Sequence, residues 1–211
     1  MKVVIFDMDG TLIDSQHDIT VSINHVRTQH HGLEPLSSAE VVEAINLHQR
    51  NLPKLFYGTE IYRDEDRALF EEHYHEQCIK NPLLYEGIAE LLKSLHAESI
   101  RLSVATNAPS QFARRMLTHL GVHSYFDHIY GADMVAKPKP DSEMLYSILG
   151  HYGYDVSKDR AWMVGDNSKD MMAARNSGIE GIFAIWGFSS EGEGDHIASH
   201  PSEIAKIIAK G

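Results

Sequence analysis

The chain has 211 residues, of which 43% are hydrophobic, and its formal net charge is −11. This composition is typical of a folded globular protein and excludes an intrinsically disordered one. The net negative charge argues against nucleic-acid binding as the main activity, because a phosphate backbone is bound by a basic surface. The length allows one sizeable domain, or a core domain that carries a smaller insert.

Cysteine content and hydropathy indicate where in the cell the protein is expected. Cys78 is the only cysteine, which excludes an intrachain disulfide and a cysteine-based zinc site. The N-terminal apolar run Val3–Phe6 is too short for a signal peptide, and no run in the sequence is long enough to span a membrane. We therefore expect a cytoplasmic protein whose partners are neither nucleic acid nor a membrane.

The first predicted element is a buried strand over Val3–Phe6, and the segment that follows it is predicted to be helical. Helices are predicted at Asp18–His30, after the capping-box sequence Ser37-x-x-Glu40, and from about Asp64 to Lys80. An all-helical block at this place predicts a cap inserted into a core. We expect residues 1–15 and 83–211 to form the core and residues 16–82 to form the cap.

Strands and helices alternate in the rest of the chain. Strands are predicted at Leu102–Ala105, His128–Gly131, Ala161–Val164 and Gly181–Trp186, and helices at Ile88–Leu95, Gln111–Leu120, Ser142–Leu149 and Lys169–Asn176. The last three helices are expected to end near Gly121, Gly150 and Gly178. The continuous apolar runs indicate strands covered on both faces. The fold class predicted is α/β, with a doubly wound, Rossmann-like parallel sheet and right-handed crossovers.

The strongest motif, Asp7-Met8-Asp9-Gly10-Thr11-Leu12-Ile13-Asp14-Ser15, follows the first strand directly. It places two carboxylates beyond the carboxyl end of a strand, where open parallel sheets bind their ligands. A D-x-D sequence by itself is more typical of an Asx-type turn. A calcium-binding EF-hand loop is excluded, because it requires glycine at its sixth position, whereas Gly10 is the fourth residue here.

Other strand ends carry complementary groups. Thr106 and Asn107 follow one strand, Asp166 and Asp170 follow another, and Lys137-Pro138-Lys139-Pro140 follows a third. Taken singly, these residues could be a strand-end hydroxyl, a solvated charge or a helix cap. Because all of them fall at the same edge of the predicted sheet, we interpret them together as one site.

With these motifs the chain resembles the haloacid dehalogenase superfamily over essentially its whole length. Asp7–Ser15 is similar to the first signature motif, Thr106 to the second, Lys137 to the third and Gly165–Asp170 to the fourth. The segments Val104–Pro109, Lys137–Asp141 and Ser199–Ile204, and the place of the cap, resemble the phosphoglycolate phosphatase branch. The resemblance implies a phosphatase that acts on a small phosphorylated metabolite.

The resemblance also implies the chemical roles of residues. Asp7 would be the nucleophile that becomes an aspartyl phosphate, and Asp9 would be the general acid and base. Thr106 and Lys137 would stabilise the phosphoryl oxygens. Asp170 would support Lys137 or the surroundings of the metal. Haloacid dehalogenases release halide without a proton and generally lack the second aspartate, so Asp9 favours phosphoester chemistry.

A ligand set follows from the same resemblance. Mg²⁺ would be held by the side chains of Asp7 and Asp166 and the backbone carbonyl of Asp9. Phosphate would contact Gly10 and Asn107 in addition to the catalytic residues. Lys137 is the expected cation by comparison with the family's K-P-x-P pattern, and Lys139, two residues further on, remains an alternative.

Several alternatives remain open. The same scaffold supports sugar-phosphate mutases, pyrophosphatases and nucleotidases. A signalling module phosphorylated on aspartate also places acidic residues, threonine and lysine at strand ends, but Asp9 and the large insert argue against it. The sequence contains no heptad pattern from which an oligomeric state could be predicted.

The cap contains one candidate substrate-binding residue. The segment Asn46–Lys54 is the least helix-like part of the cap, and Pro53 would interrupt a helix unless it begins the next one. Arg50 lies in this segment, where the family keeps its specificity loop, and its planar guanidinium suits a substrate carboxylate. A solvated surface arginine is the alternative interpretation.

Overall fold

The computed structural model describes residues 1–47 and 51–210, which form two compact units. The first, here called the core, comprises Met1–Asp14 and Leu84–Gly211, and the second, here called the insert, comprises Ser15–Leu83. Within the described ranges, no helix is both long enough and apolar enough to cross a membrane.

The core is built on a six-stranded sheet in which all neighbouring strands are parallel. The strands are β1 (Lys2–Phe6), β4 (Arg101–Ala105), β5 (His128–Tyr130), β6 (Arg160–Gly165), β7 (Glu180–Ala184) and β8 (His196–Ala198). Their order across the sheet is β5-β4-β1-β6-β7-β8. The chain therefore runs outward from β1 to β5, crosses to β6 on the other side of β1, and runs outward again. This confirms the predicted doubly wound α/β fold.

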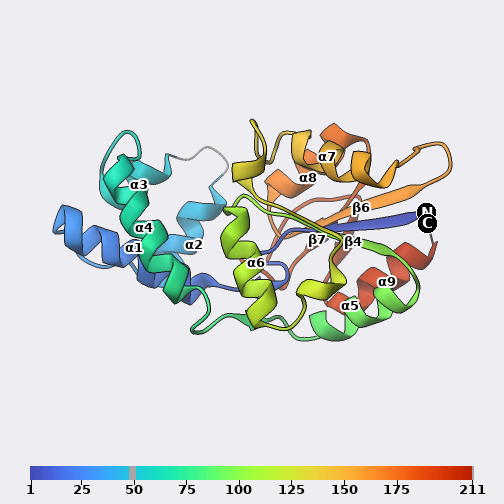
Figure 1. Ribbon diagram of the computed structural model, residues 1–211, viewed down its shortest axis with the longest axis horizontal. Coiled ribbons are helices and arrows are strands. Elements are labelled where there is room, and N and C mark those ends of the chain that lie inside the picture. The colour runs from blue at the N-terminus through green and yellow to red at the C-terminus, as the bar shows by residue number, and fades with distance from the viewer. Residues whose placement is uncertain (48–50, 211) are drawn as a thin grey trace. The chain divides into compact units, whose positions relative to one another are not determined.

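Helices cover both faces of the sheet (Figure 1). One face carries α7 (Glu143–Tyr152) and α8 (Ser168–Ser177), and the other carries α5 (Ile88–Ala97), α6 (Ser110–His119) and α9 (Pro201–Lys210). The short 3-10 helices η1 (His123–Tyr125) and η2 (Ala132–Met134) flank β5 in the chain. Because both faces are covered, Val3–Phe6 are completely buried, and the strand is an unbroken apolar run for this reason.

Two features of the core differ from the sequence prediction. The helix predicted to end at Gly150 continues to Tyr152, and Gly153 forms its C-cap at φ 63°. Glycine within a helix costs only about 1 kcal/mol, and burial of Ile148 and Leu149 on the same helix offsets this cost. The final strand β8 and helix α9 were not predicted. In the case of β8, the strand has only three residues and lacks a distinct apolar run.

The insert is helical in its described part. Its helices are α1 (Gln16–His31), α2 (Ser38–Asn46), α3 (Leu52–Tyr57) and α4 (Asp64–Gln77), and they enclose a hydrophobic cluster of Ile23, Val26, Val41, Ala44, Phe56 and Tyr57. The predicted capping box of Ser37 and Glu40 begins α2. Pro53 lies in the first turn of α3, so it begins a helix and does not interrupt one.

Two short strands mark the place where the insert enters the core sequence. The chain leaves the core through β2 (Ile13–Asp14) and returns through β3 (Leu83–Leu84), and these strands pair with each other. Within the insert, the 1% exposed Asp18 accepts hydrogen bonds from Gln77 Nε2 at 2.7 Å and from Asn81 N and Nδ2 at 3.0 and 2.9 Å. A carboxylate near the start of α1 therefore fixes the segment that follows α4.

Replacing Asp18 with alanine should destabilise the insert, because three donors would lose their buried acceptor. Hydrogen bonds to a charged group contribute about 1.5–3 kcal/mol each. Because the three bonds share one acceptor and are not additive, we expect a total loss of roughly 2–4 kcal/mol in the free energy of unfolding. Hydrogen exchange of the α1 and α4 amides would measure the change. Asp64→Ala is the matched control, since Asp64 is an exposed aspartate in the first turn of α4, and should cost less than about 1 kcal/mol. Equal losses in the two variants would contradict the assigned role of Asp18.

Candidate active site

The predicted motifs meet at the carboxyl ends of β1, β4 and β6. In the sheet, Phe6 pairs with Val104 on one side and with Val164 on the other. Asp7 continues this register, and its backbone N–H donates to the Val164 carbonyl at 2.8 Å. The strand order reverses at β1, and ligands of open α/β sheets bind at such a switch point.

Three carboxylates and one ammonium group form the centre of this region. Asp7, Asp166 and Asp170 each offer an oxygen, and these oxygens lie within 4.8 Å of one another. The Lys139 ammonium donates to Asp7 Oδ1 at 2.8 Å and to Asp170 Oδ1 at 2.6 Å. Lys139 is 4% exposed, Asp166 2% and Asp170 1%, whereas Asp7 is 9% exposed. Asp7 is thus the carboxylate most open to a ligand.

The structure corrects the expected cation. Lys137 is exposed and does not join the acidic cluster; its backbone N–H donates to Glu143 Oε2 at 2.9 Å. Lys139 is the buried lysine that contacts Asp7 and Asp170. Both lysines precede a proline in Lys137-Pro138-Lys139-Pro140, so the local sequence does not distinguish them. Burial separates them, since Lys139 is 4% exposed whereas Lys137 is exposed.

Burial and mutual repulsion shift the pKa values of the cluster. Burial, followed by the charges of Asp7 and Asp170, raises the pKa of Asp166 to about 8. Burial also raises the pKa of Asp170 to about 6, although the Lys139 charge opposes this rise. For Lys139, burial lowers the pKa, but Asp170 and Asp7 together raise it above the ordinary lysine value. Lys139 therefore stays charged, while Asp166 is poorly compensated.

Asp170 also begins a helix. Asn167 and Asp170 form a capping box at the N-terminus of α8, in which the Asn167 N–H donates to Asp170 Oδ2 at 3.1 Å. The other carboxylate oxygen of Asp170, Oδ1, accepts the hydrogen bond from Lys139. The contacts of Asp170 therefore suit both a capping role at α8 and the supporting role expected for it.

The remaining predicted residues lie around the cluster. Thr106 is 1% exposed, follows β4, and accepts a bond from the Ala108 N–H at 3.1 Å. Asn107 donates to the Lys139 carbonyl at 2.8 Å, and its Oδ1 is buried without a hydrogen-bond partner among the described residues. Gly10 has φ +84°, and a Cβ there would lie 2.3 Å from Asp166 Oδ2. Asp9 is partly exposed.

Sequence patterns did not single out three further groups at the site. The Thr11 hydroxyl donates to Asp166 Oδ1 at 3.2 Å, and the Phe188 N–H donates to Asp166 Oδ2 at 2.7 Å. Burial, with the nearby charges of Asp14, Asp166 and Asp9, raises the pKa of the half-buried Tyr85 phenol. A backbone donor such as Phe188 has no side-chain signature, so the sequence could not reveal it.

The donor set fits a divalent metal ion. Three carboxylates face one ammonium group, so two negative charges remain uncompensated when all are ionised. Carboxylate oxygens are the ligands that Mg²⁺ prefers. Because Asp170 is occupied by Lys139 and by the α8 cap, Asp7 and Asp166 are the carboxylates that would hold such an ion.

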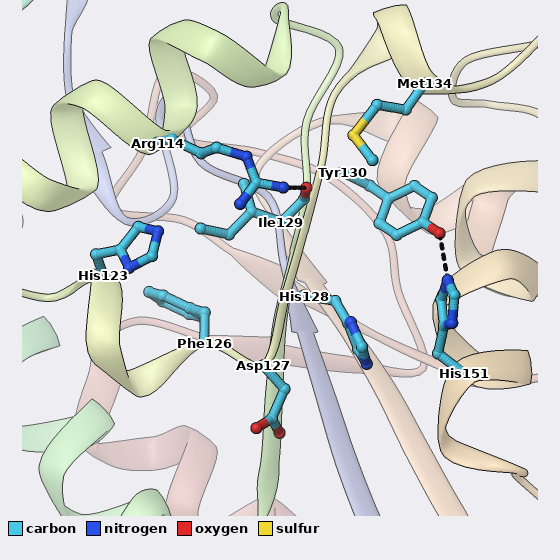
Figure 2. A pocket seen from close by; sticks show the side chains of 9 residues that line it. All are labelled: Arg114, His123, Phe126, Asp127, His128, Ile129, Tyr130, Met134 and His151. Atoms are coloured by element: carbon cyan, nitrogen blue, oxygen red, sulfur yellow. Dashed lines mark hydrogen bonds between the residues drawn. The ribbon is translucent and has the colours of Figure 1, made fainter.

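Two other features lie apart from this cluster. Arg50, the candidate substrate-binding residue, lies outside the described residues. A cavity of about 230 Å³ lies beside the edge strand β5 (Figure 2). There Arg114 donates to the Ile129 carbonyl at 3.0 Å, and the Tyr130 hydroxyl and His151 Nε2 lie 2.6 Å apart. None of the residues that line this cavity belongs to the predicted site.

Comparison with known proteins identifies the family of this chain. A family model for haloacid dehalogenase-like hydrolases matches residues 4–184. A phosphoglycolate phosphatase of Agrobacterium fabrum is 31% identical over 222 residues, covering 98% of this chain and 94% of that protein. An N-acetylmuramic acid 6-phosphate phosphatase of Pseudomonas aeruginosa is 28% identical over 217 residues, covering 99% and 95%.

Solved structures show the same fold. A haloacid dehalogenase-like family hydrolase from Streptococcus pneumoniae is 25% identical, with a TM-score of 0.79 and 97% of each chain covered. A predicted phosphoglycolate phosphatase from Haemophilus somnus is 24% identical, with a TM-score of 0.83 and coverage of 98% and 97%. With the family model matching most of its length and a relative above 30% identity, the chain belongs to the haloacid dehalogenase-like hydrolase family.

Proposed function

We propose that this phosphatase hydrolyses small phosphate monoesters through an aspartyl-phosphate intermediate on Asp7, and that phosphoglycolate is the leading candidate substrate. The observation that carries the proposal is the buried Lys139 bonded to Asp7 beside two further carboxylates at the switch point of the sheet. Relatives named for phosphatase activity over nearly their whole length support the reaction class.

Asp7 has the features of a nucleophile. Its Oδ1 is held by Lys139 at 2.8 Å, which leaves Oδ2 to attack phosphorus. The ammonium group fixes the direction of the carboxylate and offsets part of the charge that would repel an anionic ester. Attack forms the bond from Asp7 to phosphorus and breaks the bond to the ester oxygen, and water then hydrolyses the aspartyl phosphate.

Asp9 would move the proton in both steps. It would protonate the leaving alkoxide and then accept a proton from the attacking water. Its partial exposure suits a group that contacts the leaving group, whereas Asp166 and Asp170 are buried by protein contacts. Thr106, at the end of β4, would donate its hydroxyl to a phosphoryl oxygen.

Mg²⁺ is the proposed metal, held by the side chains of Asp7 and Asp166 and the carbonyl of Asp9. When bound, it would neutralise the excess negative charge of the cluster and that of the substrate phosphate. The pKa of Asp166 is raised first by burial and then by the charges of Asp7 and Asp170, and an added cation would relieve the part of the shift that comes from these charges.

The names of several relatives support phosphoglycolate as the substrate. Arg50 remains the proposed contact for its carboxylate. A long-lived aspartyl phosphate would instead favour the signalling alternative, whereas an acid–base residue at Asp9 favours turnover.

The first prediction for this function concerns leaving groups. Wild type should turn over phosphoglycolate, and Asp9→Asn should lose about 100- to 10,000-fold in kcat on it, because its alkoxide needs a proton. Loss should be much smaller for p-nitrophenyl phosphate, whose leaving group is acidic. Steady-state kinetics at fixed Mg²⁺, with N-acetylmuramic acid 6-phosphate in the same panel, would test both statements. Equal losses on the two ester types would refute the proton-donor role, and absence of turnover on phosphoglycolate would remove that substrate.

The second prediction separates the two lysines. Lys139→Met should lower kcat by more than about 100-fold, by analogy with loss of a charge-stabilising donor. It should also destabilise the fold by roughly 3–5 kcal/mol, because buried carboxylates lose their partner. Lys137→Met, at an exposed position, should leave stability within about 0.5 kcal/mol of wild type. Urea unfolding and kinetics on both variants would measure this. A larger effect at Lys137 would restore the cation expected from the sequence.

The third prediction uses the pKa of Asp166, which folding raises to about 8. A carboxyl group whose pKa is raised on folding stabilises the fold below its unfolded pKa, and this stability is lost as pH rises towards 8. Without metal, Asp166→Asn should therefore be more stable than wild type at pH 8, by roughly 2–4 kcal/mol, and the difference should shrink towards pH 4.

Mg²⁺ provides the control for this comparison. It should stabilise wild type at pH 8 by mass action and should not stabilise Asp166→Asn. Urea unfolding in EDTA and in Mg²⁺ would measure both quantities. Parallel pH profiles, or equal stabilisation of both proteins by Mg²⁺, would count against a metal at Asp166.

A further inference from the structure

The loop after β7 supplies contacts to the site that none of the recognised motifs includes. β7 lies next to β6 in the sheet, with Ile182 paired to Val164 and Phe183 paired to Gly165. The segment Trp186–Phe188, here called the β7 segment, follows the end of β7 at the same sheet edge as Asp166. It therefore reaches the acidic cluster from the side opposite to β4.

Three hydrogen bonds connect the β7 segment, the first motif and Asp166. The Trp186 indole N–H donates to the Thr11 carbonyl at 3.0 Å. The Phe188 N–H donates to Asp166 Oδ2 at 2.7 Å, and the Thr11 hydroxyl donates to Asp166 Oδ1 at 3.2 Å. Each carboxylate oxygen of Asp166 is thus held by a different loop, and the indole joins these two loops to each other.

The packing leaves little freedom for this arrangement to shift. A Cβ at Gly187 would lie 1.9 Å from the Gly10 carbonyl oxygen and 2.6 Å from Asp166 Cβ. A Cβ at Gly10 would lie 2.9 Å from the Phe188 ring. Backbone of the first motif therefore lies directly against backbone of the β7 segment, and only glycines allow this approach.

We infer that Trp186 is a positioning residue for Asp166, which it orients through the Thr11 and Phe188 bonds for metal binding. The inference rests on the proposed role of Asp166 as a metal ligand. Groups that hold a ligating carboxylate raise metal affinity, because the ligand loses less freedom when the metal binds. Trp186 acts one contact further from the metal than Thr11 or Phe188.

Trp186→Phe tests this role, because it keeps an aromatic ring and removes the N–H donor together with part of the indole ring system. Titration calorimetry with Mg²⁺ alone should show a Kd weaker by about two- to tenfold, the range of one hydrogen bond. The Mg²⁺ concentration for half-maximal rate should rise by the same factor, with a smaller change in kcat. If Trp186 had a structural role alone, the variant would lose stability but would not show a larger change in Mg²⁺ requirement than in kcat. Urea unfolding is therefore measured in parallel. An unchanged Mg²⁺ Kd would overturn the inference.

Two further variants make the result specific. Trp162→Phe is the matched control: it removes an indole N–H that donates to Glu180 Oε2 at 3.2 Å in the same sheet, and it should leave the Mg²⁺ Kd unchanged. An equal weakening in this control would overturn the inference.

Thr11→Val should weaken Mg²⁺ binding by about tenfold, as loss of a direct partner of a ligand. The double variant with Trp186→Phe should lose less than the product of the single effects, because both act on Asp166. If the effects on the Mg²⁺ Kd multiplied in the double variant, this would contradict the inference that both residues act through Asp166. The metal assignment itself fails if wild type does not bind Mg²⁺, or if Asp166→Asn binds Mg²⁺ as tightly as wild type. In either case this inference fails with it.

Discussion

The ammonium group of Lys139 is the contact on which the candidate active site depends. It comes from the connection between β5 and α7, and it joins Asp7 after β1 to Asp170 at the start of α8. Asn107, after β4, holds the carbonyl of the same lysine at 2.8 Å. Four separate connections of the sheet are thus tied together by one residue, through its side chain and its backbone carbonyl. A buried charge is tolerated only when it is paired, so these segments keep their relative positions.

The same ion pairs leave the negative charge of the third carboxylate, Asp166, without a positive partner among the described residues. Lys139 satisfies one oxygen each of Asp7 and Asp170, while the hydrogen bonds that Asp166 accepts within the described ranges come from neutral donors, Thr11 and Phe188. The fold therefore maintains a carboxyl group with a raised pKa in the place where the proposed metal would require an anion. Perturbed carboxyl groups of this kind are common where a protein supports catalysis and not its own stability.

Sequence patterns predicted the core well, because covered parallel strands such as Val3–Phe6 are unbroken apolar runs. They missed β8, whose three residues His196–Ala198 are too few to form such a pattern. Within the site, the acidic residues follow strands and are therefore visible in the sequence. The choice between Lys137 and Lys139 was not, since both precede proline and only burial separates them. The Phe188 backbone donor is equally invisible, because any residue at that position carries an N–H.

The pairing of β2 with β3 has a consequence for how this architecture diversifies. Ile13–Asp14 and Leu83–Leu84 bring the two ends of the insert together before the helical segment begins. When the ends of a segment are already adjacent, doubling its length adds only about 0.6 kcal/mol of loop-closure cost. Helices can accordingly be gained, lost or exchanged between these strands while β1 keeps its neighbours in the sheet. Under the proposed function, such a junction would let recognition of the leaving group by the insert evolve at a different pace from the phosphoryl-transfer chemistry of the core.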